Sequence, residues 1–243
     1  ENASSIFRNL KVILPSLFGG TGIVGLYAQS SASVQIVDST IIKTGGTGSN
    51  VPWGMSIGGP GGSILLVSNV IIDITTDTTM VGGGIDFAGQ QFVMRNSVVK
   101  YTSPAGGYGI TAGGGIADIS GSTISVEATA AGTATSQGIE NSSNLVISNS
   151  IITVNENISE GTGVLATSNT VIRNSEVSGS GYGIQGPVDI NNSSIFGGLK
   201  GILKTGNSFR IGNSQIGGGH NGVAGTDKVV NCIDENYNPI PNL

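Results

Sequence analysis

The stretch VISNSIITV, residues 146–154, looks like a buried strand that is interrupted by an Asn-Ser pair. Similar stretches recur along the chain, such as VQIVDSTII from residue 34, FVMRNSVV from residue 92 and FRIGNSQI from residue 209. Ile and Val favour strands, whereas Asn and Ser favour turns. A turn pair that returns inside apolar segments indicates a repeated corner between two strands.

The repeat becomes regular when the Asn of each pair serves as its anchor. The residue two positions before the anchor is apolar in all nine repeats, and the residue three positions after it is always Ile or Val. A Gly followed by an apolar residue stands between successive anchors, as in Gly54-Met55 and Gly109-Ile110. Each repeat therefore contains three strand signals. The nine anchors are Asn9, Asp38, Asn69, Asn96, Gly121, Asn149, Asn174, Asn192 and Asn213.

Asn, Asp and Gly share a tolerance of the left-handed backbone region, so one such residue can bend a strand sharply. Corners that stack at the strand spacing of about 4.8 Å would let each Asn amide bond to the corner above and below it. The small Ser that follows the anchor in seven of nine repeats fits a stacked corner. We therefore predict a structural ladder of Asn69, Asn96, Asn149, Asn174, Asn192 and Asn213.

Three-strand coils with inward Ile and Val, whose anchors lie 18 to 31 residues apart, resemble the right-handed parallel β-helix of the pectate-lyase-like superfamily. The resemblance implies an all-β solenoid of about nine coils, of a secreted or cell-surface type without the catalytic motifs. An antiparallel sandwich would need hairpins, and a leucine-rich repeat would show a Leu consensus. We expect the β-helix over residues 1–231, with longer lateral loops in its first six coils, and a closing segment over 232–243.

Composition excludes several classes of function. The chain has 41 Gly, only 10% charged residues and a net charge of −5, without a basic run, which argues against nucleic acid as a partner. No apolar run is long enough to predict membrane insertion. Cys232 and His220 are the only residues of their types, so we expect no internal disulfide, no metal site and no cofactor.

Catalytic motifs are mostly missing. Members of the superfamily that cleave pectin carry either an Arg beside acidic calcium ligands or paired Asp residues with Gly-His-Gly and Arg-Ile-Lys motifs. Here GGGHNG, residues 217–222, supplies a single His, and FRIGN, residues 209–213, lacks the Lys. Neither stretch comes with an Asp pair. We assign no catalytic residue, which leaves catalysis as the weaker option.

Carbohydrate binding is suggested by the lateral loops, which begin near Lys43 and contain Tyr101 and several acidic residues. Aromatic rings stack on sugars and carboxylates bond their hydroxyls, although solvated loop residues are the simpler explanation. The outward row after each Gly landmark includes two acids two coils apart, about 9.6 Å, near the upper limit for an inverting glycosidase pair. The candidate carbohydrate-binding residues are Trp53, Asp86, Tyr108 and Glu140.

Three functions are compatible with the sequence. We favour an extracellular structural or adhesive module, such as a surface passenger, stalk or filament subunit. Its N-terminal coil shows no capping helix, which predicts end-to-end self-association or membership of a longer chain. The alternative is a β-helix that binds or cleaves a polysaccharide through its lateral loops and third-strand face. An ice-binding solenoid would need an outward Thr array, and the outward row from Arg8 to Gly212 contains none.

Overall fold

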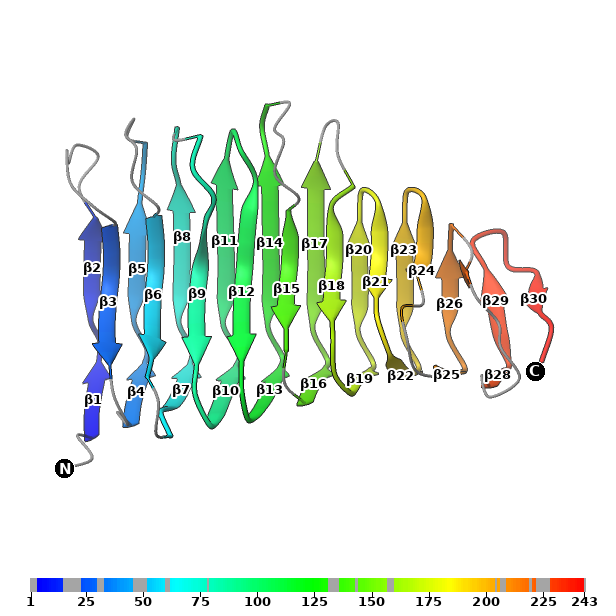
Figure 1. Ribbon diagram of the computed structural model, residues 1–243, viewed down its shortest axis with the longest axis horizontal. Coiled ribbons are helices and arrows are strands. Elements are labelled where there is room, and N and C mark those ends of the chain that lie inside the picture. Colours follow the sequence, from blue (N-terminus) through cyan, green and yellow to red (C-terminus); the bar gives the residue numbers. More distant parts are fainter. Residues whose placement is uncertain are drawn as a thin grey trace.

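The computed structural model describes residues 4–14, 23–29, 33–45, 52–59, 62–77, 79–130, 136–142, 144–156, 160–203, 205, 209–218, 220–221 and 228–242. All regular elements in these ranges are β-strands, and they form three sheets, here called A, B and C. Successive coils stack side by side into a rod that narrows toward the C-terminus (Figure 1). No helix of membrane-spanning length and hydropathy occurs in the described ranges.

Sheet A contains the strand that precedes each corner. Its strands are parallel neighbours in the order of the chain. They are β1 (Ser4–Arg8), β4 (Ser33–Val37), β7 (Ile64–Ser68), β10 (Gln91–Arg95), β13 (Ile116–Ser120), β16 (Asn144–Ser148), β19 (Thr170–Arg173), β22 (Val188–Asn191), β25 (Arg210–Gly212) and β28 (Lys228–Val230).

Sheet B contains the strand that follows each corner. Its strands are β2 (Lys11–Leu14), β5 (Thr40–Lys43), β8 (Ile71–Thr75), β11 (Val98–Ser103), β14 (Thr123–Ala128), β17 (Ile151–Glu156), β20 (Glu176–Gly179), β23 (Ser194–Gly197), β26 (Gln215–Gly217), β29 (Cys232–Asp234) and β30 (Pro239–Ile240).

Sheet C contains the strand that returns after the lateral connection at the top of Figure 1. Its strands are β3 (Ile23–Gln29), β6 (Pro52–Gly58), β9 (Gly82–Ala88), β12 (Gly107–Gly113), β15 (Gln137–Asn141), β18 (Thr162–Ala166), β21 (Tyr182–Gln185), β24 (Lys200–Leu203) and β27 (His220–Asn221).

The core is built from rows of like residues, because equivalent positions of successive coils are in register. Ile119 of β13 pairs with Ile147 of β16, which pairs with Ile172 of β19, and all three side chains are fully buried. Side chains of the same type thus stack on one another in the core, which is why the inward positions of the repeats are so uniform in sequence. The predicted right-handed parallel β-helix with three strands per coil is confirmed.

The corner between sheets A and B has the predicted left-handed backbone. Its residue has a φ between 47° and 58° at every anchor, and Asn231 adds one further corner with a φ of 52°. The backbone amide of each of the nine anchors donates to the next coil, as from Asn149 to the Arg173 carbonyl at 3.1 Å, and the Asn231 amide donates to the Asn242 side chain at 3.0 Å. One residue therefore turns the chain without leaving its N–H unpaired.

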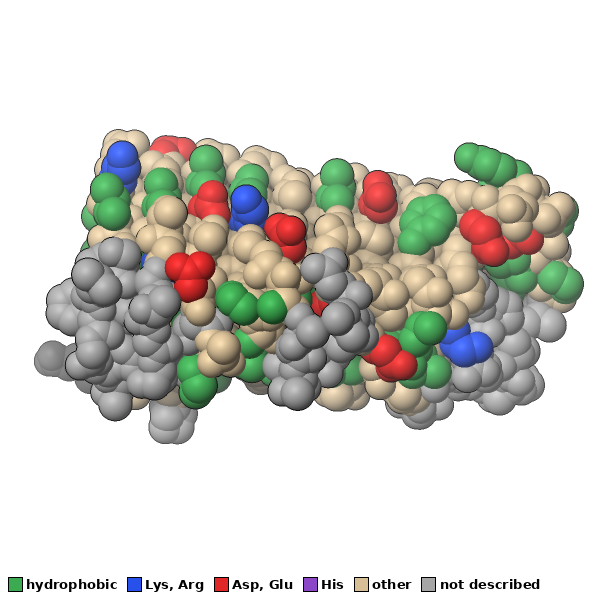
Figure 2. Space-filling model, turned by 90° about the horizontal axis from the view of Figure 1, so that it is seen from above, with side chains coloured by type: hydrophobic (Ala, Val, Ile, Leu, Met, Phe, Trp, Pro, Cys, Tyr) green, Lys and Arg blue, Asp and Glu red, His purple; other side chains and the backbone are tan. Residues whose placement is uncertain are grey.

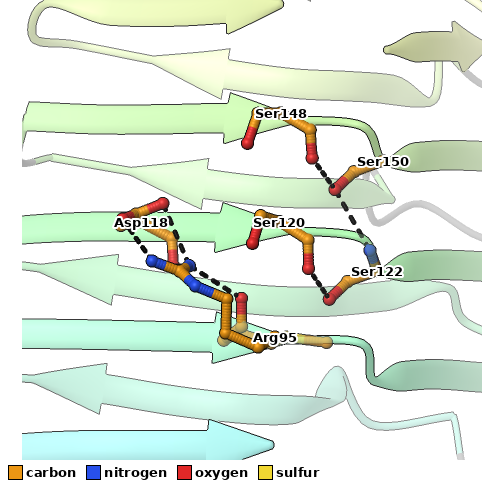
Figure 3. Close-up of polar contacts among 7 residues, drawn as sticks. Arg95, Asp118, Ser120, Ser122, Ser148 and Ser150 are labelled. Atoms are coloured by element: carbon orange, nitrogen blue, oxygen red, sulfur yellow. Dashed lines mark hydrogen bonds and ion pairs between the residues drawn. The ribbon is translucent and has the colours of Figure 1, made fainter. Parts of the chain in front are cut away.

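Serine hydroxyls form the most continuous side-chain ladder at this corner (Figure 3). The Ser150 hydroxyl donates to the Ser148 carbonyl at 2.8 Å and accepts from the Ser122 amide of the preceding coil at 3.2 Å. Equivalent bonds run without a break from the Val70 amide to the Ser214 hydroxyl. Bonds between corner side chains join Asn69 to Asp38 at 3.0 Å and Asn231 to Asn213 at 3.3 Å. The recurring Ser thus has a bonding role as well as a small size.

The Gly landmarks lie where the inward–outward alternation of sheet C is interrupted, since the glycine and the residue after it are both buried. A Cβ added to Gly109 would lie 2.5 Å from the Gly138 carbonyl oxygen and 2.3 Å from the Ile124 side chain. Gly54, Gly84 and Gly138 make equally close approaches to the next coil. Only glycine fits this row because the backbone of the neighbouring coil occupies the place of a side chain.

The two ends of the rod differ. At the C-terminal end, β29 still pairs in parallel with β26, so the repeat reaches into the segment 232–243. β30 then folds back and pairs antiparallel with β29. At the other end, Phe7, Val12 and Leu26 are only partly buried, although their partners in the next coil, Ile36, Ile41 and Met55, are fully buried.

Candidate binding face on sheet C

Two outward rows run along sheet C, separated by the Gly landmarks. In the first row Trp53 of β6 pairs with Gly83 of β9, which pairs with Tyr108 of β12. In the second row Asp86 of β9 pairs with Thr111 of β12, which pairs with Glu140 of β15. The structure therefore brings the four predicted carbohydrate-binding residues onto adjacent coils of one sheet.

Trp53 and Tyr108 stack although 54 residues lie between them in the sequence. Their ring centroids are 6.1 Å apart and their planes differ by 8°. A Cβ on Gly83, in the coil between them, would lie 2.5 Å from the indole ring. Trp53 thus leans across the space left by the missing side chain, and the two half-buried rings form one aromatic surface.

Asp86 is held by hydroxyls from the coils on either side. The Ser56 hydroxyl donates to one carboxylate oxygen at 2.9 Å, and the Thr111 hydroxyl donates to the other at 2.7 Å. Two such bonds fix the carboxylate against the sheet. The Asp86 carboxylate therefore links three coils.

Glu140 has a different environment. Within the described ranges its carboxylate forms no hydrogen bond and no ion pair. Burial raises the pKa of the Tyr108 phenol, and the charge of Glu140 raises it further, so the carboxylate lies close enough to act on that ring. Glu140 is thus an uncompensated negative charge beside the aromatic pair.

Gln137 follows Tyr108 in the first row, where β15 pairs with β12. Its amide oxygen is buried and has no hydrogen-bond partner among the residues that the structure describes. Buried polar atoms are nearly always paired, so this acceptor is an exception within the described part of the chain. Sequence analysis did not single out Gln137, because one Gln after a loop carries no distinctive signal.

Two residues of the predicted lateral loops lie in the core instead. Tyr101 of β11 is fully buried, and its hydroxyl accepts a hydrogen bond from the Gly82 amide at 3.1 Å. Lys43 ends β5 in the inward row between Leu14 and Ile74, and its amine donates to the Gly45 carbonyl. Placing them among solvated loop residues was wrong, because the inward alternation of sheet B continues past the expected end of the strand.

The remaining acidic loop residues do not join the candidate face. Asp73 and Glu127 lie on sheet B, in β8 and β14. Glu156 is at the end of β17, where its carboxylate accepts from the Ser136 amide at 2.5 Å. In β27 the backbone of His220 pairs with β24, beyond the coils that carry the candidate residues.

Charge is sparse and mostly acidic around the lateral connections, as Figure 2 shows from the top of the rod. One ion pair is found among the described side chains, between Arg95 and Asp118 on sheet A, at 2.5 Å (Figure 3). From β6 to β21, the strands of sheet C contain no Lys or Arg. Nor do the described parts of the chain gather three or more residues able to hold a metal ion.

Two shallow depressions lie elsewhere on the rod. One, of about 550 Å³, follows the corner near Asn192, Asn213 and Asn231. The other, of about 590 Å³, is lined mainly by glycines between Gly59 and Gly114. Neither is lined by a charged side chain. The aromatic and acidic groups of sheet C therefore remain the best candidate site.

No protein-family model, no curated protein and no solved structure matches this chain.

Proposed function

We propose that this protein is an extracellular structural or adhesive β-helix module, as in a surface passenger, stalk or filament subunit. The single observation that carries the proposal is the partly exposed apolar surface of the first described coil. Phe7, Val12 and Leu26 leave apolar surface partly uncovered beside the strand edges of β1, β2 and β3. Unpaired strand edges and apolar surface together favour the stacking of another coil.

Polar side chains that bond from coil to coil support a scaffold role. The buried Ser150 hydroxyl does so at the corner, and the Asp86 carboxylate does so on sheet C. A group that ties coils together is not free to act as an acid or base on a substrate. The fold and its repeat alone support a relationship to the pectate-lyase-like superfamily, which we propose without its pectin chemistry.

Sedimentation across a concentration series tests the structural proposal. We expect end-to-end association, which Phe7→Asp should abolish because it places a charge at the open end. Ile13→Asp is the matched control, because Ile13 belongs to the same coil but is 66% exposed on the outer face of sheet B. Circular dichroism checks that both variants fold. A wild-type protein that stays monomeric at the highest concentration would overturn the stacking proposal.

Glycan binding is a second candidate function, supported by the Trp53–Tyr108 stack beside Glu140. Parallel aromatic rings can pack on the apolar face of a sugar, and carboxylates can bond its hydroxyls. We do not extend this proposal to cleavage, because both oxygens of Asp86 accept hydrogen bonds from neighbouring coils. Trp53 is the only Trp, so its fluorescence reports binding of neutral and acidic polysaccharides directly.

A further inference from the structure

The candidate face of sheet C combines an aromatic surface with negative charge. Trp53 and Tyr108 supply the rings, while Asp86 and Glu140 lie in the adjacent row. Aromatic faces attract cations as well as sugar rings, and carboxylates strengthen that preference. A ligand that offers both an apolar ring face and a positive charge would satisfy all four residues.

Acidic polysaccharides fit this face poorly. Their carboxylates would approach Asp86 and Glu140, and β6, β9, β12 and β15 contain no Lys or Arg to offset the repulsion. Like charges placed together oppose binding. The charge on this face therefore selects against a polyanion.

The two carboxylates also repeat along the rod. Asp86 and Glu140 are separated by the coil of Thr111, which places their backbones about 9.6 Å apart. A ligand with several cations along its length can meet both charges, whereas a single small cation can meet only one. Gln137, the register partner of Tyr108, belongs to the same strand as Glu140, and its buried amide oxygen has no hydrogen-bond partner among the described residues.

We propose that this face binds an amine-bearing glycan, in which successive hexosamine rings carry protonated amino groups. The rings would pack on Trp53 and Tyr108, and the ammonium groups would pair with Glu140 and Asp86. This assignment rests on the second candidate function, glycan binding, and adds the charge of the ligand to it.

The test is a titration followed by Trp53 fluorescence. The probes are a glucosamine oligomer, its N-acetylated counterpart of equal length and an oligogalacturonate. We expect saturable binding of the glucosamine oligomer, about tenfold weaker binding of the neutral oligomer and none of the acidic one. Binding of the glucosamine oligomer should weaken as salt is added, because the attraction is between exposed charges.

Glu140→Gln is the decisive variant, because Glu140 forms no bond within the described structure that its loss could disturb. It should weaken binding of the glucosamine oligomer several-fold and leave binding of the neutral oligomer unchanged. Glu176→Gln makes the same change of charge at an exposed position of sheet B and should have no effect. Equal binding by Glu140→Gln and wild type would overturn the proposal.

The remaining outcomes separate this inference from glycan binding itself. If both oligomers bind equally well, glycan binding stands and the inference about charge fails. If neither binds, both proposals fail. An oligolysine of similar length is the last probe, and equally tight binding of that peptide would show that the sugar rings contribute nothing.

Discussion

Two edges of each coil contrast sharply. At the corner between sheets A and B, a single residue with nearly constant φ turns the chain in every coil. At the connection between sheets B and C, two residues join β20 to β21, whereas five join β17 to β18. Ladder bonds fix the corner, whereas the lateral connection varies in length from coil to coil. This contrast indicates that the corner, where the coils are alike, contributes most to stability, whereas the lateral connections can vary in length.

The corner should be the most sensitive place in a coil. Asn149→Val should destabilise the protein by ~1–3 kcal/mol, because Asn149 has a φ of 49° and a β-branched side chain is strained there. Denaturant unfolding measures the loss. Asn149→Gly should cost far less, since glycine adopts this φ freely. Asn155→Val, in the exposed part of β17, is the control. Equal losses in the glycine and valine variants would mean that backbone strain is not the cause.

The serine ladder should contribute separately. Ser150→Ala should cost about 1–2 kcal/mol, because it leaves the buried Ser122 amide without its acceptor and removes a bond to the Ser148 carbonyl. Ser125→Ala, on the outer side of sheet B, should change little. The same unfolding measurement applies. If both alanine variants have the same free energy of unfolding as wild type, the ladder does not contribute to stability.

At the lateral edge we expect a substitution that stabilises. Lys43→Met should raise stability by about 1 kcal/mol, because Lys43 is buried between Leu14 and Ile74 in an otherwise apolar row. Lys100→Met, on the exposed side of β11, is the control. Thermal unfolding at neutral pH distinguishes them, and a destabilised Lys43→Met protein would show that the amine is needed.

The same residue predicts a pH dependence. Burial lowers the pKa of Lys43 below its ordinary value of 10.5, with the Asp77 charge acting more weakly in the opposite direction. The unfolded chain keeps this proton up to that value, whereas the folded chain releases it at lower pH. This group therefore makes stability rise with pH between the two pKa values. The rise should be absent in Lys43→Met when unfolding is compared across alkaline pH.

The smallest effect is expected at exposed positions close to the lateral connections. Glu127→Gln should change the free energy of unfolding by less than about 0.5 kcal/mol, since Glu127 is exposed near the end of β14. A larger loss of stability, measured by denaturant unfolding in parallel with Asn149→Val, would show that the lateral edge contributes to stability as the corner does.

Most of the fold could be predicted from sequence because each coil repeats the same short pattern of residue types. The left-handed corners at residues such as Asn149, and the inward rows such as Ile119 and Ile147, follow from residue type and spacing. The limits of the strands were harder to predict. Tyr101 and Lys43 continue the inward alternation of their strands, but their polar ends made them resemble loop residues.

The candidate site was predicted only as separate residues. Asp86 and Glu140 belong to one row that the repeat defines, so their spacing of two coils was predictable. The stack of Trp53 on Tyr108 was not, because it depends on Gly83 leaving space in the coil between them. The bonds that hold Asp86 also depend on side chains from two other coils, which no single repeat contains.

Because successive coils are in direct register, the number of coils sets the length of the rod. Each strand of the repeat pairs in parallel with the equivalent strand of the neighbouring coil, as β13 pairs with β10 and β16. Duplication or deletion of a whole coil would therefore keep the parallel pairing of the remaining strands. Gene rearrangement could lengthen or shorten the rod in steps of about 4.8 Å while the surface pattern keeps its orientation.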